Sequence, residues 1–257
     1  MTITSGEAAD VRRRVEQVMG LPVSLALRGR HAGGPAADDA WRAVVEELRE
    51  VDRVFSTYRA ESWVSRLGRG EADTADAPHD VREVLDLGER ARLESGGAFD
   101  VVRDGVLDPS GVVKGWAVAR AARHLRALDD TDFCLSAGGD MVVHVAAHDR
   151  PDWRIGIEHA TDPRRVRAVV PLRSGALATS GLAHRGAHVV DARTGLAPST
   201  LASVTVIGPD LTWADIDATA ALALDAEAPA WLATRPGRTA YLQWVDGRAE
   251  TFAVPVA

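Results

Sequence analysis

One cysteine, Cys134, occurs among the 257 residues, so no disulfide can form within the chain. Long apolar runs are also missing, and none approaches the ~20 residues that a membrane-spanning helix needs. Basic blocks are absent, and 30 Lys+Arg against 37 Asp+Glu give a formal net charge of −7, which disfavours nucleic acid and anionic membranes as partners. Residues 1–7 lack the basic and then apolar layout of a secretory signal, so we expect a cytoplasmic protein.

Aromatic residues are scarce at 5%, but hydrophobic residues reach 46% and charged residues 26%, the balance of an ordinary globular protein. This composition excludes disordered and collagen-like chains. The segments 33–35 and 70–78, which contain glycine and proline, are expected to be loops and not linkers. We therefore predict one domain over residues 1–257.

Apolar residues at steps of three and four predict helices. One helix would be capped by Asp38 or Asp39 and would bury a single stripe, made of Trp41, Val44, Val45, Leu48, Val51, Val54 and Phe55. A second helix is expected over residues 81–93, with Leu93 among its apolar positions, and a third after Lys114.

Strand patterns dominate the second half. Two apolar runs, 133–135 and 141–143, flank Gly138-Gly139 and predict a β-hairpin. Further strands are expected at 23–27, 153–157, 166–172, 203–207, 241–244 and 251–254, with a helix at 213–224. Because several strands follow one another without an intervening helix, the pattern favours an α+β fold with largely antiparallel sheets over a parallel sheet.

Two glycine-containing segments stand out, and the first could bind an anion. The first runs from Glu94 to Asp100 and from Leu107 to Ala117, where Lys114 would lie at the start of a helix. Glycine lets a backbone approach a ligand, and both the lysine and the helix dipole favour a phosphate. A glycine-rich turn before a capped helix is the simpler interpretation of this segment. The second, Ala137 to Asp140, is typical of a hairpin turn.

Other polar groups could carry chemistry. Thr179-Ser180-Gly181 resembles a turn that holds phosphate or ribose, and His188 could act as a general base, although most histidines have no such role. Asp215 and Thr219 are four residues apart, so both would lie on one helical face, as hard oxygen ligands for Mg²⁺. The alternative for that pair is a helix-terminal Asp beside a Thr that bonds to its own helix.

Tyr58 follows Ser56 and precedes a serine-rich turn that ends at Ser65. Its ring could stack on a flavin or adenine, or it could finish a helix and join the core.

Read in order, these segments resemble the ApbE family, the FAD:protein FMN transferases. The resemblance covers roughly residues 19 to 225 and is carried by matching motifs in the family's order. These are Met19-Gly20, Ser56 to Ser65, Gly96 to Asp100, Asp108 to Ala117, Gly138 to Asp140, Thr179 to Gly181, His188 to Gly195 and Ala214 to Ala220. Two positions depart from the family pattern: Gly68 replaces a usual Asn, and Ala192 replaces a usual Pro.

The resemblance implies an ApbE-like α+β architecture related to the T-fold, and a site for FAD and Mg²⁺. By motif match, the implied metal ligands are Asp215, Thr219 and the backbone carbonyl of Gly111. The implied FAD site consists of Met19, Tyr58, Ala98, Phe99, Asp100, Asp108, Lys114, Thr179, Ser180 and His188.

The implied reaction is Mg²⁺-dependent transfer of FMN from FAD to a Thr or Ser hydroxyl of an acceptor protein, with release of AMP and with His188 as general base. The acceptor would carry a flavinylation motif, and no such segment occurs here. Two other interpretations stay open: Mg²⁺-dependent hydrolysis of FAD to FMN and AMP, and FAD binding without catalysis.

Overall fold

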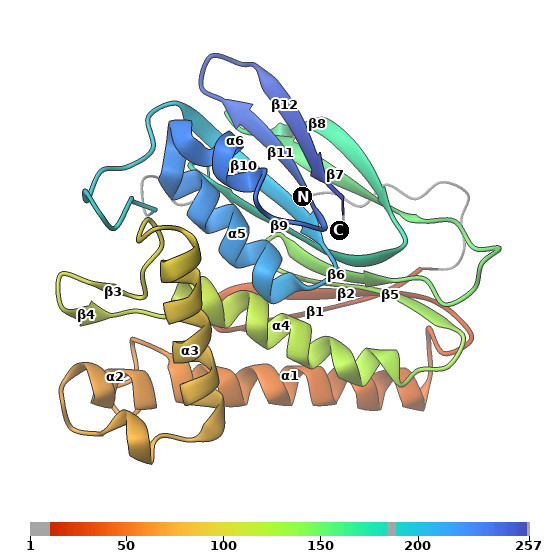
Figure 1. The fold of residues 1–257 in the computed structure, drawn as a ribbon. Coiled ribbons are helices and arrows are strands. Elements are labelled where there is room, and N and C mark those ends of the chain that lie inside the picture. The colour runs from red at the N-terminus through yellow and green to blue at the C-terminus, as the bar shows by residue number, and fades with distance from the viewer. Residues whose placement is uncertain (1–10, 184–188, 256–257) are drawn as a thin grey trace.

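The computed structural model describes residues 11–183 and 189–255, and Figure 1 shows their arrangement. Its centre is an eight-stranded sheet in the order β1-β2-β5-β6-β9-β10-β11-β12, in which every neighbouring pair is antiparallel. The strands are β1 (Arg12–Val18), β2 (Leu21–Gly29), β5 (Thr131–Ala137), β6 (Asp140–His144), β9 (Ser174–Gly181), β10 (Leu201–Gly208), β11 (Arg238–Trp244) and β12 (Ala249–Val254).

Helices cover one face of this sheet (Figure 1). The long ones are α1 (Pro35–Phe55), α3 (His79–Glu94), α4 (Ser110–Arg126) and α5 (Leu211–Leu224). The short ones are α2 (Trp63–Gly68), α6 (Ala228–Leu232) and the 3-10 turns η1 (Thr74–Asp76) and η2 (Asp225–Glu227). α4 contacts both α1 and α5, and α5 also packs on β9 and β10, so the main core lies between these helices and the sheet.

The first long helix follows the predicted stripe but not the predicted cap. Val44, Leu48 and Val51 of α1 are buried, as expected from their spacing. The helix begins at Pro35, after Gly34, and no side chain caps it. The prediction of a cap at Asp38 or Asp39 is therefore wrong, because proline pre-sets the backbone for the first helical turn and moves the start upstream.

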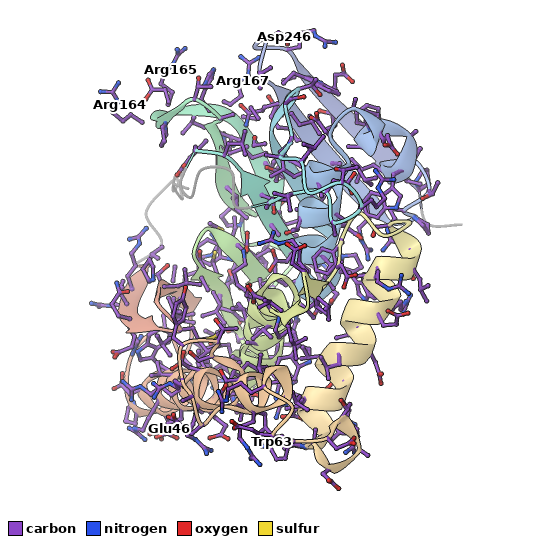
Figure 2. The ribbon with its side chains drawn as sticks, turned by 90° about the vertical axis from the view of Figure 1, so that its left-hand side faces the viewer. Glu46, Trp63, Arg164, Arg165, Arg167 and Asp246 are labelled. Carbon is purple, nitrogen blue, oxygen red and sulfur yellow. The ribbon has the colours of Figure 1, made fainter. Side chains whose placement is uncertain are left out.

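A second hairpin covers the other face of the sheet. It consists of β7 (Trp153–His159) and β8 (Asp162–Leu172), and buries Trp153 and Ile155 against a small second core. Most of β8 is exposed. Figure 2 shows Arg164, Arg165 and Arg167 pointing outward near the hairpin tip, at the same end of the molecule as Asp246.

A tight turn joins β5 to β6. Ala137 pairs with Asp140, and Gly138 and Gly139 between them have φ of 58° and 101°. Both values are in the left-handed region that glycine tolerates, which confirms the hairpin predicted from the sequence. The turn places Asp140 at the first position of β6, where it is wholly buried.

The predicted α+β class is confirmed, with some local corrections. Leu93 is exposed, so it does not belong to the buried side of α3. α4 begins at Ser110, before Lys114, because Asp108 accepts a hydrogen bond from the Ser110 backbone N–H (3.0 Å) at the helix start. Sequence patterns do not predict β1, β9, α2, α6 or the small hairpin of β3 (Val102–Arg103) and β4 (Val106–Leu107). In the described residues, no helix has the length and apolar character that crossing a membrane requires.

Candidate functional site

Helix α5 carries the first part of the site. It begins after Asp210, whose side chain accepts a hydrogen bond from the Trp213 backbone N–H (3.1 Å). Both faces of α5 are buried, because it packs between α4 and strands β9 and β10. Asp215 and Thr219 lie one turn apart on this helix, and Asp215 is 1% exposed. A carboxylate so deeply buried requires compensation by a cation or by hydrogen-bond donors.

Lys114 supplies part of that compensation. It lies in the second turn of α4, and its ammonium forms ion pairs with Asp140 and, at 3.2 Å, with Asp215 Oδ1. It is the only lysine in the chain, where all other strongly basic residues are arginine. A single lysine in an otherwise arginine-based chain is itself a sequence signal for this site.

Asp140 joins the cluster from the β5–β6 hairpin, although its sequence context predicted only a turn. Its Oδ1 accepts the backbone N–H of Thr179 at 2.9 Å, while its Oδ2 pairs with Lys114. Three segments that are far apart in the sequence therefore meet through their charged side chains.

Thr179 and Ser180 belong to strand β9 and do not form the predicted turn. The strand holds their hydroxyls in place, with Thr179 Oγ1 2.9 Å from Thr205 Oγ1 and Ser180 Oγ 2.9 Å from Thr219 Oγ1. The Thr219 hydroxyl therefore contacts a residue of the sheet, and its partner is not confined to its own helix. Hydroxyl oxygens thus gather beside the buried carboxylate.

Glycines let the two helices approach each other closely. A Cβ atom at Gly115 would lie 2.8 Å from both Asp215 Cβ and the Leu211 carbonyl oxygen. A Cβ at Gly111 would lie 3.0 Å from Phe99 Cε2. A Cβ has no room at Gly115 and would press on the Phe99 ring at Gly111, so these glycines let Phe99 and Asp215 pack closely against the same helix.

The remaining loop residues lie around α4. The Ala98 carbonyl accepts a hydrogen bond from the Ala192 N–H (3.0 Å), so the segment after His188 contacts the Gly96–Asp100 segment. Asp100 accepts the Val102 N–H (2.8 Å). Asp108 lies at the start of α4, the same end of the helix at which Gly111 meets Phe99. Of the predicted segments within the described residues, those at 96–100, 108–117, 137–140, 179–181 and 214–220 thus meet around α4.

Met19 is half-buried against the main core, whereas Tyr58 lies on the surface. Met19 has φ of 57°, in the tight β1–β2 turn, and it borders a depression of about 440 Å³ together with Arg59. Tyr58 is 98% exposed, so the alternative in which it joins the core is wrong. His188, the predicted base, lies outside the described residues.

The electrostatics of the cluster leave one negative charge uncompensated. Burial alone would lower the pKa of Lys114, but Asp140 and Asp215 raise it above its ordinary value, so the ammonium stays protonated. Burial raises the pKa of Asp215, and Lys114 opposes that shift only in part. Two carboxylates share one ammonium, and Asp215 Oδ2 is buried without a hydrogen-bond partner. Such an arrangement suits a divalent cation beside an anion.

Comparisons with known proteins identify the family of this chain. The sequence profile of the ApbE family matches residues 19–106 and 102–242. An FAD:protein FMN transferase from Klebsiella pneumoniae is 28% identical over 173 residues, which are 60% of this chain and 49% of that protein. The chain therefore spans about half the length of that relative.

Solved structures agree in fold. An ApbE protein from Thermotoga maritima superposes with a TM-score of 0.80 at 20% identity, covering 94% of this chain and 96% of the other. A flavinyl transferase ApbE from Pseudomonas stutzeri, in its apo form, gives 0.79 at 23% identity, with 95% of each chain covered. At these identities the likeness concerns the fold.

Proposed function

This chain belongs to the ApbE family, and from that premise we propose that it is an FAD:protein FMN transferase. It would move FMN from FAD to a Thr or Ser hydroxyl of an acceptor protein and release AMP. The observation that supports this most directly is the meeting of Lys114, Asp140 and Asp215 in one buried cluster beside the Thr219 and Ser180 hydroxyls. A fold without a ligand has no need for an under-compensated buried carboxylate at this position.

The residues present fit a magnesium ion. Asp215 Oδ2 has no donor, and a carboxylate, a hydroxyl and a carbonyl are the hard oxygen ligands that Mg²⁺ prefers. Asp215, Thr219 and the Gly111 carbonyl would hold it. When bound, Mg²⁺ would spread the negative charge that develops on the diphosphate.

The FAD would be held by groups already placed around α4. The Lys114 ammonium would bind the diphosphate, with Thr179 and Ser180 nearby, while Ala98, Phe99, Asp100 and Asp108 would line the adjoining loops. The exposed ring of Tyr58 and the side chain of Met19 would contact the rings of the dinucleotide.

The reaction itself is a substitution at phosphorus. The acceptor's hydroxyl oxygen forms a bond to the phosphorus of the FMN half, and the bond from that phosphorus to the oxygen of the AMP half breaks. The hydroxyl proton goes to a base, for which we propose His188, and AMP leaves with the bridging oxygen.

The proposal can be tested by incubating the protein with FAD, Mg²⁺ and a candidate acceptor, followed by mass spectrometry. We expect the acceptor to gain the mass of FMN less one water, with an equal amount of AMP formed, and EDTA to abolish both. Full transfer in EDTA would contradict the metal requirement. Free FMN and AMP without a modified acceptor would favour the hydrolase alternative, and FAD that stays intact would favour binding without catalysis.

The role of His188 can be tested separately. His188→Ala should lower the transfer rate by about 10²–10⁴-fold, the usual contribution of a general base, while FAD affinity stays close to that of the parent. A variant that transfers FMN at the parental rate would show that another group takes the proton.

The cytoplasmic location and the single domain over residues 1–257 stay predictions. Co-expression with candidate acceptors, followed by a search for a fluorescent flavin band on a denaturing gel, would test where an acceptor is modified and identify it.

A further inference from the structure

Asp140 has no part in the reaction described above, yet it is wholly buried in the centre of the cluster. Each of its oxygens already has a partner: Oδ1 accepts the Thr179 N–H at 2.9 Å, and Oδ2 pairs with the Lys114 ammonium. A carboxylate whose two oxygens are both engaged is a poor candidate for a metal ligand. Its position therefore needs another explanation.

The explanation lies in the charge that Asp140 carries. Lys114 contacts two carboxylates, Asp140 and Asp215, and no other lysine exists in the chain. With one ammonium and two carboxylates, the cluster carries a net charge of −1 when both carboxylates are ionised. Without the charge of Asp140, the ammonium would have Asp215 as its sole acidic partner, and the cluster would be neutral. A divalent cation would then compete directly with the lysine for Asp215.

We propose that Asp140 is a positioning residue that holds Lys114 and so keeps the carboxylate of Asp215 available to a divalent cation. The rigid hairpin turn at Gly138-Gly139 and the Thr179 N–H fix Asp140 in the sheet, opposite α4 and α5. Asp140 acts through Lys114 and touches neither metal nor substrate. This inference rests on the proposed function, because it assumes that Asp215 binds a metal ion.

The proposal can be tested by measuring Mn²⁺ binding to the protein without nucleotide. Electron paramagnetic resonance detects the binding as a loss of the free Mn²⁺ signal. Asp140→Asn preserves shape and removes the charge, and it should weaken Mn²⁺ binding by about 10–100-fold, as is usual for groups that support a metal ligand. Asp225→Asn is the matched control: that carboxylate also accepts backbone N–H groups but lies outside the cluster, and its loss should leave Mn²⁺ affinity unchanged.

A double variant separates charge from structure. Asp140→Asn combined with Lys114→Met restores the net charge of −1 and removes the competing ammonium, so Mn²⁺ affinity should return to within about threefold of the parent, well inside the loss expected for the single variant. A merely structural role for Asp140 predicts no such recovery. If the single variant does not fold, the Mn²⁺ affinity of the double variant, which lacks the competing ammonium, decides alone.

Parental affinity in Asp140→Asn, or a double variant that binds as weakly as the single one, would overturn the proposal. A parent protein that binds no Mn²⁺ at all, with or without FAD, would instead refute the metal site of the proposed function, and the role of Asp140 with it.

Discussion

Helix α5 carries two buried aspartates, two residues apart, whose surroundings differ. Asp217 is wholly buried, and its oxygens pair with Arg235 (2.8 Å) and Arg238 (2.8 Å), so two cations serve one carboxylate. Asp215 is equally buried but shares one ammonium with Asp140, and one of its oxygens has no donor. Asp217 therefore faces two guanidinium groups, whereas Asp215 shares its one ammonium with a second carboxylate.

The difference follows from helix geometry. Residues two apart project about 200° from each other, so Asp217 points toward the arginines near and on β11, while Asp215 points toward α4. Arg235 also pairs with Glu94 and lies over the rings of Trp213 and Trp231, which ties α5 to α3 and α6. A buried carboxylate that two guanidinium groups contact supports the fold, whereas one that shares a single ammonium is available to a ligand.

The largest expected effect concerns Asp215. Asp215→Asn removes the single anionic ligand proposed for Mg²⁺, so we expect transfer to fall by about 10³-fold, equivalent to the several kcal/mol that a bound metal supplies. The free energy of unfolding should change by less than about 1 kcal/mol, because the charge that is lost was poorly compensated. Initial rates of AMP release measure the loss of transfer, and urea unfolding measures the change in stability. Loss of folding together with activity would make Asp215 a structural residue like Asp217.

The opposite pattern is expected for Asp217. Asp217→Ala leaves two arginines without their buried partner and should lower the free energy of unfolding by about 3–5 kcal/mol. Urea or thermal unfolding, followed by far-UV circular dichroism, measures this. At temperatures where the variant is folded, its Mn²⁺ affinity should match that of the parent. A stable variant with impaired metal binding would remove the contrast between the two faces.

Glycines offer a subtler comparison of the faces. Gly115→Ala would bring a methyl group to 2.8 Å from the Leu211 carbonyl oxygen and from Asp215 Cβ, and should destabilise the protein by about 1–3 kcal/mol while weakening Mn²⁺ binding. Gly208→Ala is the matched control on the other face, because its neighbour at 3.0 Å is the flexible Arg238 side chain. We expect the control to cost less than about 1 kcal/mol, and equal costs would show that the contact at Asp215 has no special rigidity.

A third aspartate, directly after α5, gives the smallest effect. Burial alone would raise the pKa of Asp225, but hydrogen bonds from Ser199, Leu201 and Thr200 lower it below its ordinary value. Because the folded pKa is the lower one, this stabilisation is complete above the unfolded value of about 3.9 and is lost as the pH falls through the folded value.

Asp225→Asn should therefore lower the free energy of unfolding by about 1 kcal/mol at neutral pH and flatten its fall in acid. Denaturant unfolding across this pH range measures the slope. A slope identical to that of the parent would mean that other carboxylates cause the acid sensitivity.

Local patterns in the sequence determined much of the fold. The apolar stripe of α1, the two glycines between β5 and β6 and the apolar run of α5 each specify an element through periodicity or backbone freedom, which depend on near neighbours in the chain. The order of the motifs also identified the family, because a series of short segments in a fixed order is far more specific than any one of them.

Only the tertiary structure decided how the charged residues are used. The sequence contains Asp215 and Asp217 in almost the same context, and nothing local says that one meets two arginines while the other meets a shared lysine. Nor does it show that Asp140 joins Lys114, or that Thr179 and Ser180 belong to a strand. The charge balance of a buried group depends on residues brought to it from distant segments, and packing of α4 and α5 against the sheet settles which those are.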